Sequence, residues 1–314
     1  MTIPSTTANL PASTTLAGRR RVGGRRERPP AGVSPKAGYY FVALYVVLLL
    51  AMGIAPTIYA VALALSTSGG IGASHFVNTF NGFNFLGAFE HVLEFEGIWL
   101  ASQSVIVVLL ALMLHNLARR VNSVFRFLFY LPGAMAGAAS VVVWLFMFDP
   151  GTSPFAFILH GFNFTILDQA VAPNNLPVIF AIMAFFTGAG GWIVVMYGAL
   201  NNIPTELIEA AEIDGSSAFR TALHIKLPLI RKWVVYMLVL SFAAGSQLFV
   251  EPQILNVATA GLVPNQWSPN QLAYYTAFNL DQFNDAAAIS VDLLVLGLLI
   301  AALLVWRGRL FEVD

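Results

Sequence analysis

The sequence contains no cysteine and few charged residues. The absence of cysteine excludes disulfides, thiol nucleophiles and cysteine-ligated metal sites. Only 10% of the 314 residues are charged and 58% are hydrophobic, whereas soluble domains carry about 25% charge. The sequence has no Walker A loop, no nucleophile elbow and no histidine spacing typical of metal ligands. The composition therefore indicates a membrane protein and gives no sign of an enzyme or of ATP hydrolysis in this chain.

Six apolar stretches are long enough to cross a bilayer as helices, since about 20 residues suffice. They lie near residues 40–65, 98–117, 127–148, 178–200, 233–255 and 286–306. We therefore expect an all-α membrane protein, a bundle of six transmembrane helices within residues 39–306, with its core at about 98–306. In this layout the irregular connections 66–97, 149–177 and 256–285 share one side of the membrane, and loops 118–126 and 201–232 share the other.

Lysine and arginine are confined to one side of this layout. All 16 fall before the first predicted span, in the loops 118–126 and 201–232, or after the last span. Because these residues are enriched in cytoplasmic segments, both termini are predicted to be cytoplasmic. Residues 1–38 are predicted to form a disordered basic tail that sets the topology, with lipid or nucleic-acid binding as the alternative that we do not favour. Residues 307–314 are expected to form a second, short cytoplasmic tail.

The longest polar segment in the chain spans residues 204–228, between the fourth and fifth predicted spans. Its first half carries four acids, Glu206, Glu209, Glu212 and Asp214. Helices that lie on a membrane surface usually carry Lys or Arg on their polar face, so this composition argues against a surface helix. A basic protein partner fits the acidic segment better.

Local signals divide this segment into two short helices. Gly215 is suited to end the first helix in the left-handed region, and Ser216 or Ser217 is suited to cap the second. We expect the second helix to bury Phe219, Ala222 and Leu223. It is expected to stop at Leu227, because a residue that precedes proline is disfavoured in the helical region.

The same segment carries a pattern at fixed spacing: Glu-Ala-Ala, three residues, glycine, nine residues, isoleucine, one residue and Leu-Pro. The matching residues are Glu209, Ala210, Ala211, Gly215, Ile225, Leu227 and Pro228. This pattern resembles the EAA-loop signature of permease subunits of binding-protein-dependent ABC importers. The flanking residues Gly198-Ala199-Leu200 and Ile213-Asp214 are similar to the sugar-uptake branch, the maltose and glycerol-phosphate type.

The resemblance implies a subunit of the bacterial inner membrane that forms half of a pathway for a sugar or sugar-like solute. It implies four kinds of contact: a second permease that is a different chain, two cytoplasmic ATPase subunits, an extracytoplasmic solute-binding protein, and membrane lipid. ATP and Mg would bind to the ATPase subunits, with no cofactor in this chain. The segment would act as a cytoplasmic coupling helix through Glu209, Ala210, Ala211, Asp214, Gly215, Leu227 and Pro228.

A few polar residues near the spans are candidates for the substrate pathway. Glu251 falls near the outer end of the fifth predicted span, and Asp292 falls in the sixth. Gln247 lies one turn before Glu251 and is predicted to share its helix face. Ionisable residues in spans usually face a cavity or a partner, and their side chains suit sugar hydroxyls. Trp144 offers a ring for stacking. The alternative is that these residues only make hydrogen bonds between helices.

Other functions remain open from the residues alone. An importer for a non-sugar solute is one, and a polytopic membrane enzyme acting on lipid-linked sugars is another, with Glu251 and Asp292 as acid and base. A secondary transporter is a third, although the usual internal repeat is not evident. Only the importer hypotheses give the acidic, glycine-hinged segment a role.

Overall fold

The structure is a computed structural model that describes residues 35–135 and 137–308. Most of the predicted basic tail and residues 309–314 lie outside the described residues. The chain divides into one unit that ends at Gly53 and a second that begins at Ile54. The described part of the first unit is helical, with α1 (Pro35–Leu49) followed by the π-helical η1 (Leu50–Ile54).

The second unit is almost entirely helical. Its first part comprises α2 (Ala55–Leu65), the antiparallel pair β1 (Ser66–Thr67) and β2 (Gly70–Ile71), α3 (Ser74–Asn81), α4 (Phe85–Ser102), η2 (Gln103–Val107), α5 (Val108–His115), α6 (Arg119–Tyr130), η3 (Leu131–Met135), α7 (Ala138–Phe148), α8 (Ala156–Gly161), α9 (Leu167–Ala170) and η4 (Pro173–Asn175). Its second part comprises α10 (Leu176–Asn201), α11 (Thr205–Ile213), α12 (Ala218–Thr221), η5 (Ala222–Lys226), α13 (Leu227–Gly245), α14 (Val250–Ala258), α15 (Pro269–Phe278) and α16 (Phe283–Arg307).

Within the described residues, five helices are long and apolar enough to cross a membrane. They are Val42–Leu65, Phe85–His115, Pro173–Asn201, Ala218–Gly245 and Phe283–Arg307. A bent pair, Arg120–Met135 and Ala138–Phe148, makes a sixth if it is counted as one span. The prediction of an all-α membrane protein is confirmed, and the count of six depends on this pair.

The third predicted span differs most from expectation. Residues 127–148 are predicted to form one transmembrane helix, but this stretch belongs to two helices that are bent by 104° relative to each other. Gly137 precedes α7 with a φ of 84°, a backbone conformation outside the right-handed helical region. A straight helix and a broken helix can both have this apolar composition. The composition therefore did not reveal the break.

Two further predicted boundaries are wrong because helices extend through polar residues. The second long helix begins at Phe85, so Glu90, Glu94 and Glu96 are helical and do not belong to an irregular connection. The fifth begins at Ala218 and includes the basic residue Lys226. A helix satisfies its own backbone hydrogen bonds, so it continues past the apolar run wherever its side chains find water or partners.

The fifth helix also ends earlier than predicted. α13 stops at Gly245, and α14 is a separate helix. The connection 256–285, which we predicted to be irregular, contains α15. Ser268 caps α15 by accepting from the Gln271 backbone at 3.2 Å, and its hydroxyl donates to the Leu248 carbonyl at 2.7 Å. Capping and a tertiary contact therefore order a segment that lacks a clear helical pattern.

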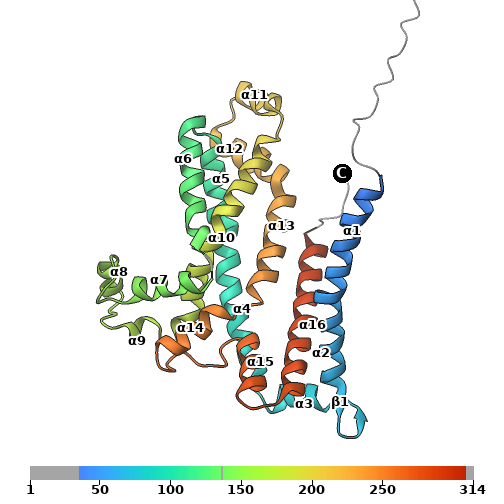
Figure 1. Cartoon of the computed structure of the whole chain (residues 1–314). Coiled ribbons are helices and arrows are strands. Elements are labelled where there is room, and N and C mark those ends of the chain that lie inside the picture. Colours follow the sequence, from blue (N-terminus) through green and yellow to red (C-terminus); the bar gives the residue numbers. More distant parts are fainter. Residues whose placement is uncertain (1–34, 136, 309–314) are drawn as a thin grey trace, which may run out of the picture. The chain divides into compact units, whose positions relative to one another are not determined.

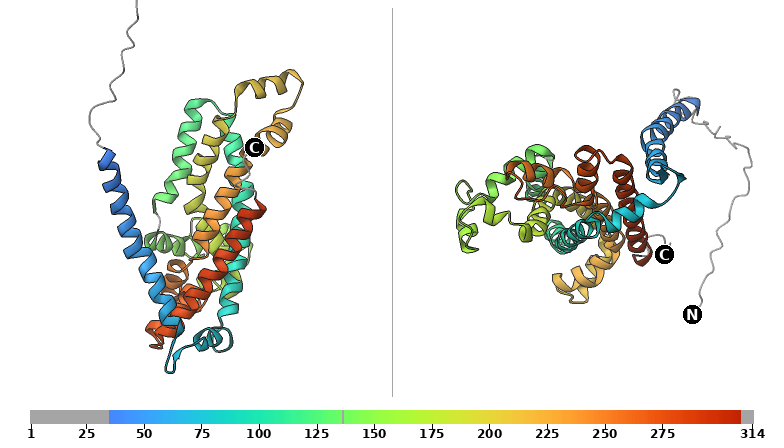
Figure 2. Two further views of the ribbon diagram at one scale, coloured as in Figure 1. Left: turned by 90° about the vertical axis from the view of Figure 1, so that its right-hand side faces the viewer. Right: turned by 90° about the horizontal axis from the view of Figure 1, so that it is seen from below.

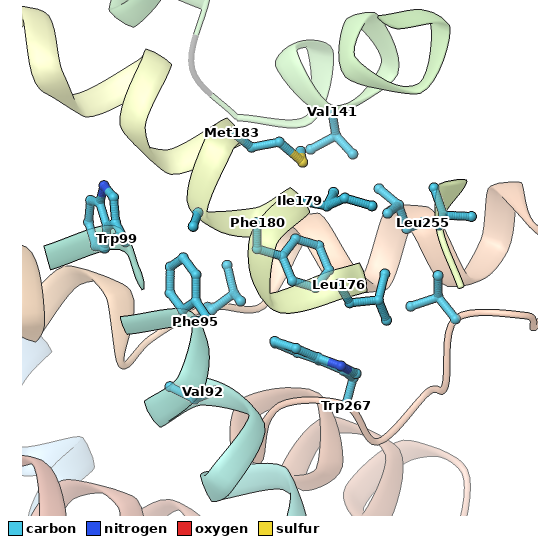
Figure 3. Packing of buried hydrophobic residues seen from close by; sticks show 14 residues of the cluster. Val92, Phe95, Trp99, Val141, Leu176, Ile179, Phe180, Met183, Leu255 and Trp267 are labelled. Carbon is cyan, nitrogen blue, oxygen red and sulfur yellow. The ribbon is translucent and has the colours of Figure 1, made fainter. Parts of the chain in front are cut away.

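The core of the second unit surrounds aromatic residues of α4 and α10 (Figure 3). Trp267, from the connection before α15, is almost fully buried there. Its ring packs edge-on against Phe180 at 4.7 Å and is stacked with His91 at 5.3 Å between ring centroids. Burial of such large side chains supplies much of the packing energy and fixes α15 against α4. A second core joins α5, α10 and α13.

The second unit has two distinct ends. α11 and the start of α6 lie at one end, and α3 and α15 lie at the other (Figure 1). We call these the α11 end and the α15 end. Viewed along the bundle, α11 projects away from the packed helices (Figure 2). The chain returns to the bundle through α12, η5 and α13, so residues 202–226 form an exposed segment anchored at both of its ends.

Candidate functional site

The exposed segment, residues 202–226, turns at Gly215. The Gly215 backbone has a φ of 74°, in the left-handed region that was predicted for it. Its N–H donates to the Glu212 carbonyl at 3.0 Å, and the Ser216 N–H donates to the Ala211 carbonyl at 2.9 Å. This pair of bonds is the Schellman arrangement, which satisfies the last carbonyls of α11. The first helix therefore ends as the sequence predicted.

The second short helix begins with the predicted cap but does not bury the predicted residues. The Ser217 hydroxyl accepts from the Arg220 N–H at 3.3 Å. Phe219 and Leu223, which we expected to be buried, are exposed, and Thr221 is buried instead. Ala222 packs against the second core, as predicted. α12 has only four residues and continues directly into η5. The orientation of η5 therefore sets which side of α12 faces the bundle.

Leu227 does not stop the helix, contrary to prediction. Its backbone is helical, with φ −63° and ψ −46°, and α13 begins there with Pro228 in its first turn. The preceding five residues form the π-helical η5. Proline removes one backbone donor, and a wider π turn before it accommodates the ring without breaking the helix. Leu227 and Pro228 thus belong to the root of α13, whereas the acidic residues lie on the projecting part.

The projecting part combines acidic and apolar exposed side chains. Glu209, Ala210, Asp214 and Gly215 are exposed, whereas Ala211 is buried. Ile213 is 87% exposed. Isolated apolar side chains at a surface are common, but here Ile213 and Phe219 flank the Gly215 turn on either side. The arrangement offers two apolar anchors beside carboxylates, a combination suited to a partner with apolar pockets and a basic rim.

A second candidate site lies inside the bundle and was missed by sequence analysis. Glu96 and Trp99 of α4 and Gln103 of η2 are three and four residues apart, so they share one helix face. Glu96 is 2% exposed, and both of its carboxylate oxygens have no hydrogen-bond partner among the described residues. The same holds for Trp99 Nε1 and Gln103 Nε2. Buried polar groups are nearly always paired, so this concentration of unpartnered groups needs an explanation.

This interior polar face packs against α13. The Ser241 hydroxyl donates to Gln103 Oε1 at 2.7 Å. A Cβ at Gly245 would lie 2.6 Å from Glu96 Oε1 and 2.7 Å from the Trp99 ring, so a larger residue there would displace these side chains. We name the interior polar face as Glu96, Trp99, Gln103 and Ser241, closed by Gly245. The sequence signal for this face is the recurrence of polar residues three and four positions apart. It was missed because the predicted second span starts at residue 98, whereas the helix starts at Phe85.

Gln247, one of the residues predicted for the substrate pathway, lines a cavity of the second unit. The cavity has a volume of about 330 Å³ and lies among α2, α13, α15 and α16. Its polar lining residues are Thr57, Ser246, Gln247, Asn270 and Ser290. Gln247 stands in the turn after α13, not on the same helix as Glu251, so the predicted shared face is wrong.

The other three predicted pathway residues lie in different surroundings. Glu251 is half-buried in the first turn of α14, and burial raises the pKa of its carboxyl group. Asp292 of α16 lies beside Thr79 of α3, with Oδ2 unpartnered among the described residues. Trp144 stacks on Phe148 with 5.4 Å between ring centroids, so part of its ring is already covered. No hydrogen bond or ion pair in the described part of the chain joins Glu251 to Asp292.

Metal ligation does not emerge from the described part of the chain, where no group of three or more His, Asp or Glu residues converges. The chemistry available at both candidate sites is therefore that of hydrogen bonding, charge and apolar contact.

Comparison with known proteins relates this architecture to transport systems. A family model described as "Binding-protein-dependent transport system inner membrane component" matches residues 95–311. Two curated relatives are each called sn-glycerol-3-phosphate transport system permease protein UgpA. The protein from Yersinia pestis is 29% identical and that from Shigella flexneri 28%, each over 197 residues, 61% of this chain. The match spans 63% of the length of these relatives.

Two solved structures share the fold. One is a bacterial ABC transporter involved in the import of the acidic polysaccharide alginate, with a TM-score of 0.72 over 88% of this chain and 96% of that chain. The other is the alginate transporter in complex with an alginate pentasaccharide-bound periplasmic protein, with a TM-score of 0.71 and the same coverage. Both are 20% identical in sequence, so the likeness concerns the fold alone.

Proposed function

Because this chain belongs to the family of binding-protein-dependent transport system inner membrane components, we propose that it is a permease subunit of an ATP-driven ABC importer. In this role it is a multi-pass protein of the inner membrane and not itself an enzyme. It forms half of a pathway for a sugar or sugar-like solute. The observation that carries the proposal is the exposed segment, in which the EAA pattern is turned outward by the Schellman arrangement at Gly215.

The α11 end is the cytoplasmic end in this proposal. Described basic residues at the roots of α6 and α13 and at the end of α16 support it, among them Arg120, Arg231 and Arg307. Because Lys and Arg are retained on the cytoplasmic side during insertion, both termini are cytoplasmic too. The α15 end then faces the extracytoplasmic space, where a solute-binding protein docks.

The exposed segment is the contact with the ATPase subunits. Ile213 and Phe219 insert as apolar anchors, and Glu209 and Asp214 meet basic residues at the rim. A second permease, a different chain, completes the pathway, and two ATPase subunits hold ATP and Mg. The alginate transporter, whose structure contains a periplasmic protein, supports an extracytoplasmic partner of this kind.

The interior polar face contributes to the solute route. Hydroxyl groups both donate and accept hydrogen bonds, and this face offers both: Trp99 Nε1 and Gln103 Nε2 donate, and Glu96 accepts. These groups are unpartnered in the described structure, where α4 and α13 are packed together, and separation of the two helices exposes them to a solute. Gln247 and the cavity at the α15 end lie on the approach to this route. Glu251, Asp292 and Trp144 remain secondary candidates.

A membrane enzyme acting on lipid-linked sugars is the less supported alternative. It requires Glu251 and Asp292 to act on one reacting centre, yet they lie on different helices and no ion pair joins them in the described part of the chain. It also leaves the exposed acidic segment without a role. Uptake of a non-sugar solute stays compatible with everything argued for the ATPase contact.

The ATPase contact is tested by Gly215→Val. A β-branched residue is strongly disfavoured at positive φ, so the turn that presents α11 is distorted. We expect co-purification of the ATPase subunits from native membranes to fall about tenfold or more, while the permease still reaches the membrane. The measurement is the ratio of ATPase to permease in the purified complex.

Gly261→Val is the matched control, because Gly261 has a φ of 90° and open space around it but lies away from the exposed segment. The ratio of ATPase to permease should remain at the wild-type level in this variant. Retention of the ATPase subunits and of normal uptake by Gly215→Val contradicts the proposed function.

A further inference from the structure

The exposed segment is fastened to the bundle by a buried lysine. Lys226, the last residue of η5, is 6% exposed. Its ammonium group lies 3.1 Å from Asn116 Oδ1 and 3.1 Å from His115 Nδ1. These two residues end the long helix Phe85–His115, where the last backbone carbonyls carry partial negative charge. The ammonium group thus lies at the C-terminal end of a helix that is distant from it in sequence and binds side chains there.

The chemistry of this contact defines the state of the histidine. An ammonium group only donates hydrogen bonds, so Nδ1 of His115 must accept, and the neutral ring carries its proton on Nε2. The Leu200 backbone is a further hydrogen-bond partner of the ring. Leu200 precedes the exposed segment and Lys226 closes it, so His115 contacts both ends of the segment.

Two further elements meet at the same place. The Tyr197 ring of α10 lies 6.4 Å from the His115 ring, and the Arg126 guanidinium of α6 lies 4.7 Å from the centroid of Tyr197. We call Lys226, His115, Asn116, Tyr197 and Arg126 the basal cluster. It ties η5 to α5, α6 and α10, so a displacement of the segment is opposed by a buried charge that loses its partners.

The helix that ends at the basal cluster also carries the interior polar face. Gln103 lies 12 positions before His115, and Glu96 lies 19 positions before His115. At 1.5 Å per residue, these separations correspond to roughly 18 and 29 Å along one helix. The helix is continuous through η2, whose π turn begins at Gln103. Both the polar face and the basal cluster therefore include a π turn, a feature that often marks functional positions.

We propose that the basal cluster transmits movement of the exposed segment to the interior polar face through the continuous helix Phe85–His115. Lys226 is the positioning residue of this device, since its ammonium group joins the segment directly to the end of that helix. The proposal rests on the function proposed above and adds to it the route by which the ATPase cycle reaches the solute pathway. It predicts that a substitution of Lys226 leaves ATP hydrolysis intact but prevents hydrolysis from opening the pathway.

The test uses an introduced thiol as a probe, because the chain has no cysteine of its own. Ser241→Cys places a sulfur at a buried position of the interior polar face. In the full importer reconstituted in nanodiscs, we measure the rate at which a small cationic methanethiosulfonate modifies this thiol, with and without ATP plus vanadate. We expect the trapped nucleotide to change the rate about tenfold, a typical size for coupling between sites.

Lys226→Met keeps the apolar stem and removes the ammonium group. We expect the complex to assemble and hydrolyse ATP, while the nucleotide no longer changes the thiol rate. Lys226→Arg should restore most of the response, because a guanidinium also donates to both partners. The double variant with His115→Leu should be no worse than Lys226→Met alone, since both act on one contact. His224→Ala is the matched control on the exposed side of η5 and should respond as the wild type.

Each result decides the proposal. A full nucleotide response in Lys226→Met overturns it, and so does failure of that variant to assemble, because a transmitting role leaves assembly intact. Absence of a nucleotide response in the Ser241→Cys chain with Lys226 in place overturns transmission to this face. Co-purification of the ATPase with Gly215→Val is scored separately, so failure of the transmission route is distinguishable from failure of the importer function.

Discussion

The exposed segment and the interior polar face both place an acid beside a glycine, in opposite surroundings. At the α11 end, Gly215 is required by its backbone, because its φ of 74° disfavours any side chain, although a Cβ added there would have open space within 4 Å. Inside the bundle, Gly245 has ordinary helical geometry and is required by space, because Glu96 and Trp99 occupy the position of a Cβ. One glycine shapes a surface, and the other permits a close approach of two helices.

The surroundings decide what each acid does. Carboxylates on the exposed segment keep their water and cost little, so they are free to recognise a basic partner. The Glu96 carboxyl group is buried from bulk solvent without a hydrogen-bond partner among the described residues, an arrangement that costs stability. A cost of this kind persists where function requires it, so the contrast between the two acids is open to test by substitution.

Glu96→Leu should produce the largest divergence between stability and function. Removal of two unpartnered oxygens should raise the free energy of unfolding by about 1–3 kcal/mol, whereas uptake should fall about tenfold or more, since a site that hydrogen-bonds hydroxyls loses an acceptor. The measurements are thermal unfolding in detergent and uptake, by the reconstituted importer, of the solute that co-purifies with its binding protein.

Glu94→Leu is the control for this prediction, because Glu94 is exposed on the same helix. It should change neither quantity substantially. If Glu96→Leu transports at the wild-type rate, the interior polar face has only a structural role. Glu96 and the acids of the exposed segment would then differ in burial alone.

Gly245→Ala sharpens the contrast between the two kinds of glycine. The added methyl group would overlap Glu96 and Trp99, and overpacking of this kind costs about 1–3 kcal/mol. Gly297→Ala, on α16 with open space at the Cβ position, should instead be neutral or stabilising by up to about 1 kcal/mol, as alanine favours helix. Chemical or thermal unfolding of the purified variants measures both, and equal effects would show that helix propensity, not the close approach, dominates.

Ser217→Ala should have the smallest effect. The hydroxyl caps the start of α12, and loss of such a cap costs about 1 kcal/mol. Because α12 belongs to the exposed segment, the loss should appear as faster hydrogen exchange at Arg220 and Thr221 and leave the core unchanged. Protection lost throughout α13 as well would mean that the segment and the bundle unfold together.

The predictions from sequence succeeded where the cause was local. The left-handed turn at Gly215 and the cap at Ser217 depend on residues within one or two helical turns, and both are present. The helix stop at Leu227 was wrong because a neighbouring π turn accommodates the proline, an outcome that residue preferences do not reveal. Phe219 was misplaced because the direction of a short helix is set by the helix that follows it.

The sequence by itself determined that this chain is a helical membrane protein with an acidic, glycine-turned segment, because bilayer length, charge distribution and capping are properties of neighbouring residues. Only the tertiary structure decided which buried residues meet. Glu96 and Gly245, or Lys226 and His115, are separated by more than a hundred positions and come together through packing of α4, α5 and α13. No local pattern specifies such pairs, since their contact depends on where each long helix begins, how far it extends and which of its faces is turned inward.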